Sequence, residues 1–496
     1  SFGSNHPELI WKTMESEHFL VHYQQGTKRT AIDALEIAEF VYEPITSMYD
    51  FEPSDKTHIV IKDTDDFSNG SAYFFDNKIE IWCNPLDYDL RGSHRWVENV
   101  ITHEFVHIIQ LGASLKYGRG VPSLYIQSMG YEDEKRKDVL YGYPNTIMSY
   151  AIPSVSVPPW FAEGVAQHMY SNANFDFWDT HREMILRDAF INNSVMSIDE
   201  MSSFGKRGIG NEQIYNQGFS IANFLDDKYG PQVFRDISNE LSKPFQYSFS
   251  SAFKKSTGDS FDSIYTEWFR ESDSLYAQSA PLNESSGEVL IDDALRSIHP
   301  VWSPDGKKFA YLSSKDNDYF GQLDLYVYTF EDSTANKLAS GAYSAPEWLN
   351  DSLLIFSVKS PPNKNGSRYY DLYIKSIKLK DEPAKRLTYE KRLTSPSIDI
   401  KSNKISAVSI SDGTSNIFVA EIDTSIYNFS SIDDKNKKDK LLFNSVTDFR
   451  EGQKIFSLSF NENKILFDMV DSHGRDILSY SLDDLEVNLV KENIWD

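Results

Sequence analysis

Apolar residues follow two different spacings along the chain, and the change between them divides the sequence into two parts. Up to about residue 280, the three- and four-residue spacings of helices alternate with the two-residue alternation of strands. Beyond residue 290 the strand pattern dominates. Residues 279–287 are rich in Ser, Pro and Gly, which is typical of linkers. The sequence therefore predicts a multidomain chain, with an α+β domain over 1–280, a linker over 281–290 and an all-β domain over 291–496.

The first part mixes both kinds of element. We predict strands over residues 18–23, 57–62 and 78–82, and helices over 30–50, 230–241 and 259–272. A further helix is expected over 95–111, because Val100, Ile101, Phe105 and Ile108 recur at helical spacing and no Gly or Pro interrupts them. Residues 112–157 are rich in Tyr, Ser, Gly and Pro and are interpreted as a loop region.

The second part repeats itself. Four similar units begin near Trp302, Trp348, Ile398 and Leu458, which are spaced 46, 50 and 60 residues apart, and each unit is followed by further predicted strands. A period of roughly 40–50 residues with four strands per unit is typical of a β-propeller. The W-S-P-D-G-K run of the first unit resembles the blades of Tol-system and prolyl-oligopeptidase propellers. A β-sandwich is the alternative. Four blades are few for a propeller, and an outer strand over 487–490 precedes the end of the chain, so we expect further blades in the natural protein.

The helix predicted over 95–111 carries the motif H-E-x-x-H, formed by His103, Glu104 and His107. Residues four apart lie on one helix face, so both imidazoles can reach a single metal ion. Zn²⁺ accepts His nitrogens, and a neighbouring Glu can act as general base on metal-bound water. The alternative is a chance occurrence of two His at this spacing.

A catalytic zinc site needs a third protein ligand. The metzincin continuation is absent, because Gln110 and Ser114 stand where Gly and His are needed. Glu163 is the candidate, since it lies one turn into a helix that the double proline before Trp160 predicts. An ordinary solvated Glu is the alternative.

At this point the sequence resembles a known family. H-E-x-x-H followed by Trp160-x-x-Glu163-Gly164-x-Ala166 resembles the gluzincin metallopeptidases, of the thermolysin and aminopeptidase N type. The resemblance implies an α+β peptidase domain, with His103, His107 and Glu163 as ligands of one catalytic Zn²⁺ and Glu104 as general base. It also implies a tyrosine that stabilises the oxyanion, for which Tyr215 is the nearest match. A core tyrosine is the alternative there.

The same resemblance implies an edge strand that pairs with the substrate backbone, for which Gly70, Ser71 and Ala72 are the candidates. The preceding Asp63-Thr64-Asp65-Asp66 cluster is interpreted as a turn, with a Ca²⁺ site as the alternative, although the EF-hand pattern is absent. His168 lies five residues after Glu163, on another helix face, and is expected to flank the site.

Composition limits the partners. The formal net charge of −25 argues against nucleic acid, and no run of eighteen apolar residues is present to span a membrane. Cys83 is the single cysteine, so no intramolecular disulfide can form. The chain starts at Ser1 rather than Met, which favours a processed, extracytoplasmic protein in the periplasm or secreted.

These observations predict a zinc metallopeptidase that acts on peptide or protein substrates, with a possible protein partner on the propeller. An endopeptidase is favoured, because residues 69–72 contain no Glu to grip a substrate's free amine. The alternatives are an aminopeptidase and a catalytically silent binding or scaffold protein.

Overall fold

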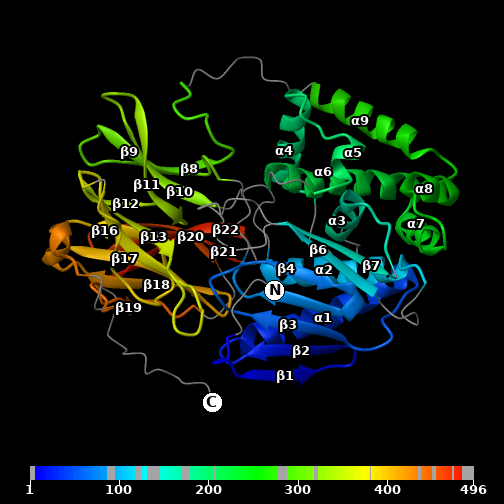
Figure 1. Cartoon of the computed structure of the whole chain (residues 1–496), viewed down its shortest axis with the longest axis horizontal. Coiled ribbons are helices and arrows are strands. Elements are labelled where there is room, and N and C mark those ends of the chain that lie inside the picture. The colour runs from blue at the N-terminus through cyan, green and yellow to red at the C-terminus, as the bar shows by residue number, and fades with distance from the viewer. Residues whose placement is uncertain are drawn as a thin grey trace.

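The computed structural model describes residues 6–85, 95–117, 124–130, 146–152, 154–168, 178–204, 208–277, 288–317, 322–379, 381–433, 437–449, 454–471 and 474–482. Helices and a mixed sheet make up the first part of the chain, and antiparallel sheets make up the second (Figure 1). The protein is therefore a mixed α/β chain with several separate sheets.

The first part contains a five-stranded sheet in the order β1-β2-β3-β5-β4. Strands β2, β3 and β5 are parallel, while β1 and β4 run antiparallel to their neighbours. Alternate residues of β3 are buried, as its two-residue period predicts. The short β4 closes one edge of the sheet. The strands are β1 (Trp11–Glu15), β2 (Phe19–Gln24), β3 (Thr57–Lys62), β4 (Gly70–Tyr73) and β5 (Lys78–Trp82).

Helix α2 connects this sheet to the other helices. It contacts α1, β4 and β5, and it also packs against α3 and α7 (Figure 1). Its apolar residues are almost all buried, including Ile101, Phe105 and Ile109. The helices are α1 (Lys28–Tyr49), α2 (Trp96–Ala113), α3 (Pro159–Gln167), α4 (Thr180–Ile191), α5 (Ile198–Met201), α6 (Gly208–Tyr229), α7 (Gln232–Ser242), α8 (Phe249–Thr257) and α9 (Phe261–Ala277).

The second part consists of four successive antiparallel units. The first two join into one eight-stranded sheet, and the third and fourth form separate sheets that pack through buried aliphatic and aromatic side chains. The units are β8 (Ser297–Trp302), β9 (Lys308–Ser313), β10 (Leu323–Thr329) and β11 (Thr334–Ala342); β12 (Glu347–Asn350), β13 (Leu353–Lys359), β14 (Tyr370–Ser376) and β15 (Lys385–Arg386); β16 (Leu393–Asp399), β17 (Lys404–Ser411), β18 (Thr414–Glu421) and β19 (Asn444–Ser445); β20 (Lys454–Asn461), β21 (Lys464–Asp471) and β22 (Gly474–Ser481).

Most predicted elements are confirmed. Strands 57–62 and 78–82 match β3 and β5, and the helix expected over 95–111 is α2. The interpretation of 112–157 as a loop region is wrong, because β6 (Leu124–Gly130) and β7 (Thr146–Ile152) pair there as an antiparallel ribbon. The Tyr and Ser content suggested a loop, yet Tyr and β-branched residues also favour strands. The strand expected over 487–490 and most of the linker lie outside the described residues.

Candidate metal centre

Two histidines of the centre come from one face of α2. His103 and His107 are four residues apart, so one helical turn places them side by side. Their rings lie 4.7 Å apart between centroids and nearly perpendicular, at 88°. The apolar face of α2 is buried in the core, which fixes the direction in which both imidazoles point.

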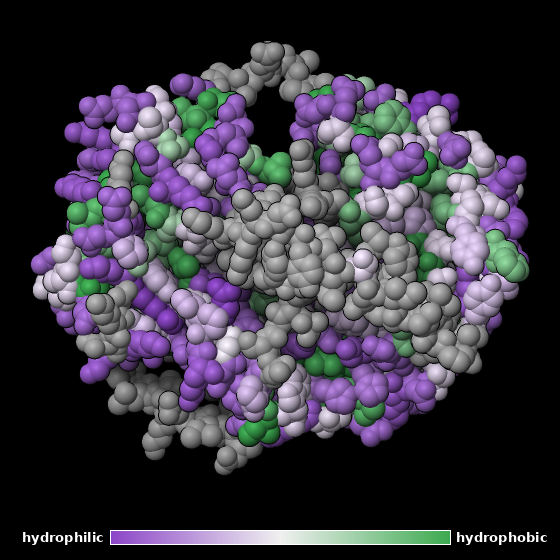
Figure 2. Space-filling view, in the orientation of Figure 1, coloured by the Kyte–Doolittle hydropathy of each residue, from purple (hydrophilic) through white to green (hydrophobic). Residues whose placement is uncertain are grey.

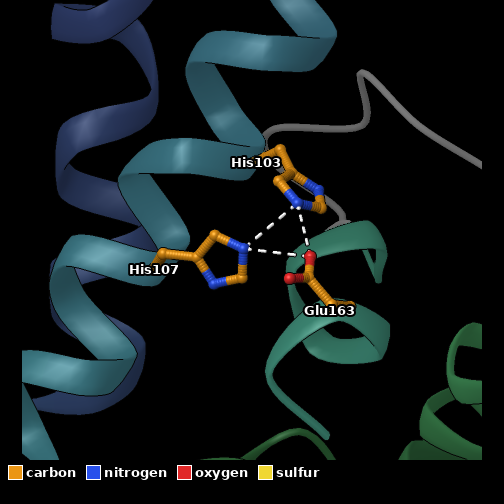
Figure 3. Close-up of side chains that lie close together, drawn as sticks. All are labelled: His103, His107 and Glu163. Carbon is orange, nitrogen blue, oxygen red and sulfur yellow. Dashed lines mark hydrogen bonds and ion pairs between the residues drawn. The ribbon is translucent and has the colours of Figure 1, made fainter. Parts of the chain in front are cut away.

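The third residue comes from α3, which is separated from α2 by more than forty residues. The helix begins at Pro159, as the double proline predicts, and Trp160 is buried against Phe261. Glu163 therefore faces α2 from a short helix whose own apolar residues are in the core. Figure 3 shows the Glu163 carboxylate pointing toward both imidazoles.

A close crossing of α3 and α6 holds α3 in place. A Cβ added at Gly164 would lie 2.3 Å from the carbonyl oxygen of Gly218, and one added at Gly218 would lie 2.5 Å from the carbonyl oxygen of Trp160. Both positions therefore require glycine, because a side chain would push the helices apart. The sequence motif contained Gly164, but nothing in it indicated Gly218.

The three side chains converge on one point. Nε2 of His103 and Oε2 of Glu163 are 3.0 Å apart, the two Nε2 atoms are 3.1 Å apart, and Nε2 of His107 lies 3.2 Å from the same Oε2 (Figure 3). Zinc bonded to such atoms at 2.0–2.1 Å in a tetrahedral shell would separate them by about 3.3–3.4 Å. Within the described residues, these three are the one group of three or more His, Cys, Asp or Glu that could hold a metal ion. The donor set thus fits zinc.

Burial and charge act against each other in the centre. Burial alone would raise the pKa of Glu163, but His107 and His103 hold it well below the usual range. Burial would lower the pKa of His107, yet Glu163 raises it above the ordinary value. Nδ1 of His107 is buried without a hydrogen-bond partner among the described residues. This differs from most metal-binding histidines, whose second nitrogen donates to a carboxylate or carbonyl.

Glu104 lies beside the three ligands rather than among them. Its carboxylate is buried, and burial raises its pKa, with the nearby Glu163 adding to the effect while the two histidines oppose it. The backbone N–H of Ala72 donates a hydrogen bond to it. The edge strand β4, which contains Gly70, Ser71 and Ala72, therefore lies next to the predicted base.

The other predicted residues lie at different distances from the three ligands. The centroid of the Tyr215 ring lies 6.1 Å from that of His103, with 26° between the ring planes, so α6 places this residue beside the centre. His168 flanks the centre without joining it, because its nitrogens contact Asn223 and Asp226 of α6. The Asp63–Asp66 cluster forms a turn whose carboxylates contact the second part of the chain, as described below.

Comparisons with known proteins cover less than half of the chain. No family model and no curated protein matches the chain. A prolyl endopeptidase structure matches at 11% identity over 40% of this chain and 29% of its own, with a TM-score of 0.28. The β-propeller domain of the Trilobed protease from Pyrococcus furiosus matches at 11% identity over 37% of this chain and 68% of its own, with a TM-score of 0.23. TolB from Acinetobacter baumannii matches at 15% identity over 37% of this chain and 54% of its own, with a TM-score of 0.19. The chain thus spans less than a third of the length of the prolyl endopeptidase, so this match does not establish the activity of the whole protein.

These comparisons correct the family expected from the sequence. Peptidases and β-propeller proteins are among the matched structures, and these structures provide no sign of a gluzincin domain. The assignment to the gluzincin metallopeptidases is therefore wrong. Two short motifs carried it, and such motifs can match outside a family. The arrangement of His103, His107 and Glu163 does not depend on this family assignment, because it follows from the distances between their side chains.

The surface agrees with the composition. Figure 2 shows a largely hydrophilic face with apolar residues scattered over both parts of the molecule. None of the helices within the described ranges combines the length and apolarity needed to cross a bilayer.

Proposed function

We propose that the chain is a zinc-dependent hydrolase that cleaves peptide bonds within peptide or protein substrates. The observation that carries the proposal is the convergence of three ligand atoms within 3.0–3.2 Å of one another beside a buried glutamate. His103, His107 and Glu163 would hold the ion. Bound zinc supplies Lewis acidity, which polarises a carbonyl and makes water more acidic.

The remaining roles belong to the side chains around the ligands. Glu104 takes a proton from the attacking water and passes it to the leaving amine, since its buried carboxylate lies beside the three ligands. Tyr215 donates a hydrogen bond to the developing oxyanion. The backbone of Gly70, Ser71 and Ala72 binds the extended substrate by strand addition at the edge of the sheet.

Endopeptidase action is favoured over aminopeptidase action. Residues 70–72 form the edge strand beside Glu104, and none of them carries a carboxylate that could bind a free amine. We further propose that the four antiparallel units are blades of a β-propeller, which would restrict access to the centre or recruit a protein partner. A scaffold protein without turnover is the competing function.

Replacing Glu104 tests the proposal. Glu104→Gln keeps the shape of the side chain and removes the base, so we expect one zinc per chain to remain while cleavage of a peptide library falls by about 10²–10⁴-fold. Metal analysis and library cleavage on both proteins provide the measurement. The matched control is Glu98→Gln, which lies on the same helix outside the centre. If the zinc-loaded wild type cleaves no library peptide and no unfolded protein, the result would contradict the proposed hydrolase and support the scaffold function.

A further inference from the structure

The segment between β3 and β4 joins the two parts of the molecule. It contains the acidic cluster and leads directly into the edge strand beside Glu104. Both Asp65 and Asp66 have left-handed backbones, with φ of 63° and 44°. Asp tolerates this conformation better than most residues other than Gly and Asn, and contacts with the second part of the chain hold the segment in it.

Those contacts come from Arg392, which directly precedes β16. Its Nη1 donates to Oδ2 of Asp63 at 2.9 Å and its Nη2 to the other oxygen, while Nε donates to Oδ1 of Asp66 at 2.5 Å. The guanidinium is 16% exposed, and the two carboxylates are 6% and 7% exposed. A planar fork that binds two carboxylates fixes orientation as well as distance.

Backbone groups of the second part complete the attachment. The backbone N–H of Arg368 donates to Oδ1 of Asp65 at 2.8 Å, and that of Tyr370 donates to Oδ2 of Asp66 at 2.7 Å. An arginine and backbone amides thus bind the carboxylates of the acidic cluster, which accounts for their position without a calcium ion.

The attachment continues into β4. The Phe67 ring packs edge-on against Trp82 of β5, and the carbonyl of Asn69 accepts the backbone N–H of Trp82. Gly70 follows, where an added Cβ would lie 2.8 Å from Oε1 of Glu104. With so little space, a shift of this segment must move either the strand or the carboxylate.

We propose that Arg392 is a positioning residue that holds the β3–β4 segment, and through it β4, against Glu104. The inference rests on the proposed function, and it makes the second part of the chain a component of the centre. Arg392 touches neither the ligands nor Glu104, so its effect must act through the segment.

Two readouts test the inference. In Arg392→Met we expect kcat/KM to fall about 10- to 100-fold, because a displacement of about 1 Å costs this much and β4 both lies against Glu104 and binds the substrate. Zinc content should stay at one per chain, since α2 and α3 carry the ligands. Hydrogen exchange of a peptide that covers residues 69–76 should become faster, because the Ala72 amide loses its fixed acceptor. Arg392→Lys keeps the positive charge but removes the planar fork, so its activity and its exchange should lie between those of the wild type and Arg392→Met. This variant also provides a test if Arg392→Met folds poorly.

Arg29→Met is the matched control. Arg29 also reaches across to the second part, where its Nη2 donates to Oγ1 of Thr414 at 3.0 Å, but it lies at the start of α1. Its loss should leave kcat/KM and the exchange of 69–76 near wild-type values. Exchange of residues 69–76 in Arg392→Met that equals the wild-type exchange would overturn the inference. An inactive zinc-loaded wild type would refute only the proposed function, since the exchange experiment decides the positioning role without turnover.

Discussion

At the scale of single residues, the space beside Glu104 is the most sensitive feature of the centre. A Cβ at Gly70 would lie 2.4 Å from Cγ2 of Val100 and 2.8 Å from Oε1 of Glu104. Gly70→Ala must therefore displace the strand or the base, and we expect kcat to fall about 10- to 100-fold, as it does when catalytic groups are misplaced by about 1 Å. Zinc content should be unchanged. Steady-state kinetics with metal analysis checks this, with Ser71→Ala as the neighbouring control. Normal kcat in Gly70→Ala would show that β4 and Glu104 do not constrain each other.

The sequence was sufficient to identify the residues that converge at the centre, but it did not reveal how little space surrounds them. His103 and His107 follow from helical spacing, and Glu163 from its place in a short helix. The requirement for glycine at position 70 could not be predicted, because it depends on a strand and a helix that meet only in the folded chain. The family assignment failed for a related reason, since a motif describes local chemistry and not the surrounding fold.

At the scale of elements, the crossing of α3 and α6 decides where Glu163 lies. Gly218→Ala would place a methyl group 2.5 Å from the carbonyl oxygen of Trp160, and we expect it to lower the free energy of unfolding by about 1–3 kcal/mol. Zinc affinity should fall as well, because α3, which carries Glu163, must shift relative to α2. Chemical denaturation and zinc titration provide the measurements. Asp227→Ala, exposed on the same helix, should change neither quantity, and an equally small effect of both substitutions would contradict the close crossing.

Elements with strong periodicity were predicted well, and those with mixed composition were not. The uninterrupted apolar stripe of α2 and the alternation in β3 and β5 are local properties that the chain carries in its sequence. The β6–β7 ribbon depends on pairing between segments separated by more than a dozen residues, and its Tyr and Ser content fits a loop equally well. The contact between Gly164 and Gly218 is also non-local, so only one of its two residues was noticed.

At the scale of the whole molecule, the structure joins two parts that the sequence separates. The acidic cluster was predicted as a turn, which is confirmed, but its partner Arg392 lies 329 residues from Asp63 in the chain and gave no sign of its role. Long-range ion pairs of this kind cannot be read from spacing. A second contact, from Thr30 Oγ1 to Oδ1 of Asp412 at 2.7 Å, joins the start of α1 to the turn between β17 and β18.

These contacts predict that zinc stabilises both parts together. Zinc at one hundred times its Kd adds about 2.7 kcal/mol to the free energy of unfolding of every segment that unfolds with the centre. We expect the slowest-exchanging amides of β10 and β17 to gain as much protection from zinc as those of α2, because the buried fork of Arg392 couples the sheets to the first part. In Arg392→Met the gain should shrink in the sheets and persist in α2. Hydrogen exchange with and without zinc measures both. If zinc protects α2 but leaves β10 and β17 of the wild type unchanged, the two parts unfold independently, and the ion pairs between them orient the edge strand without contributing to cooperative stability.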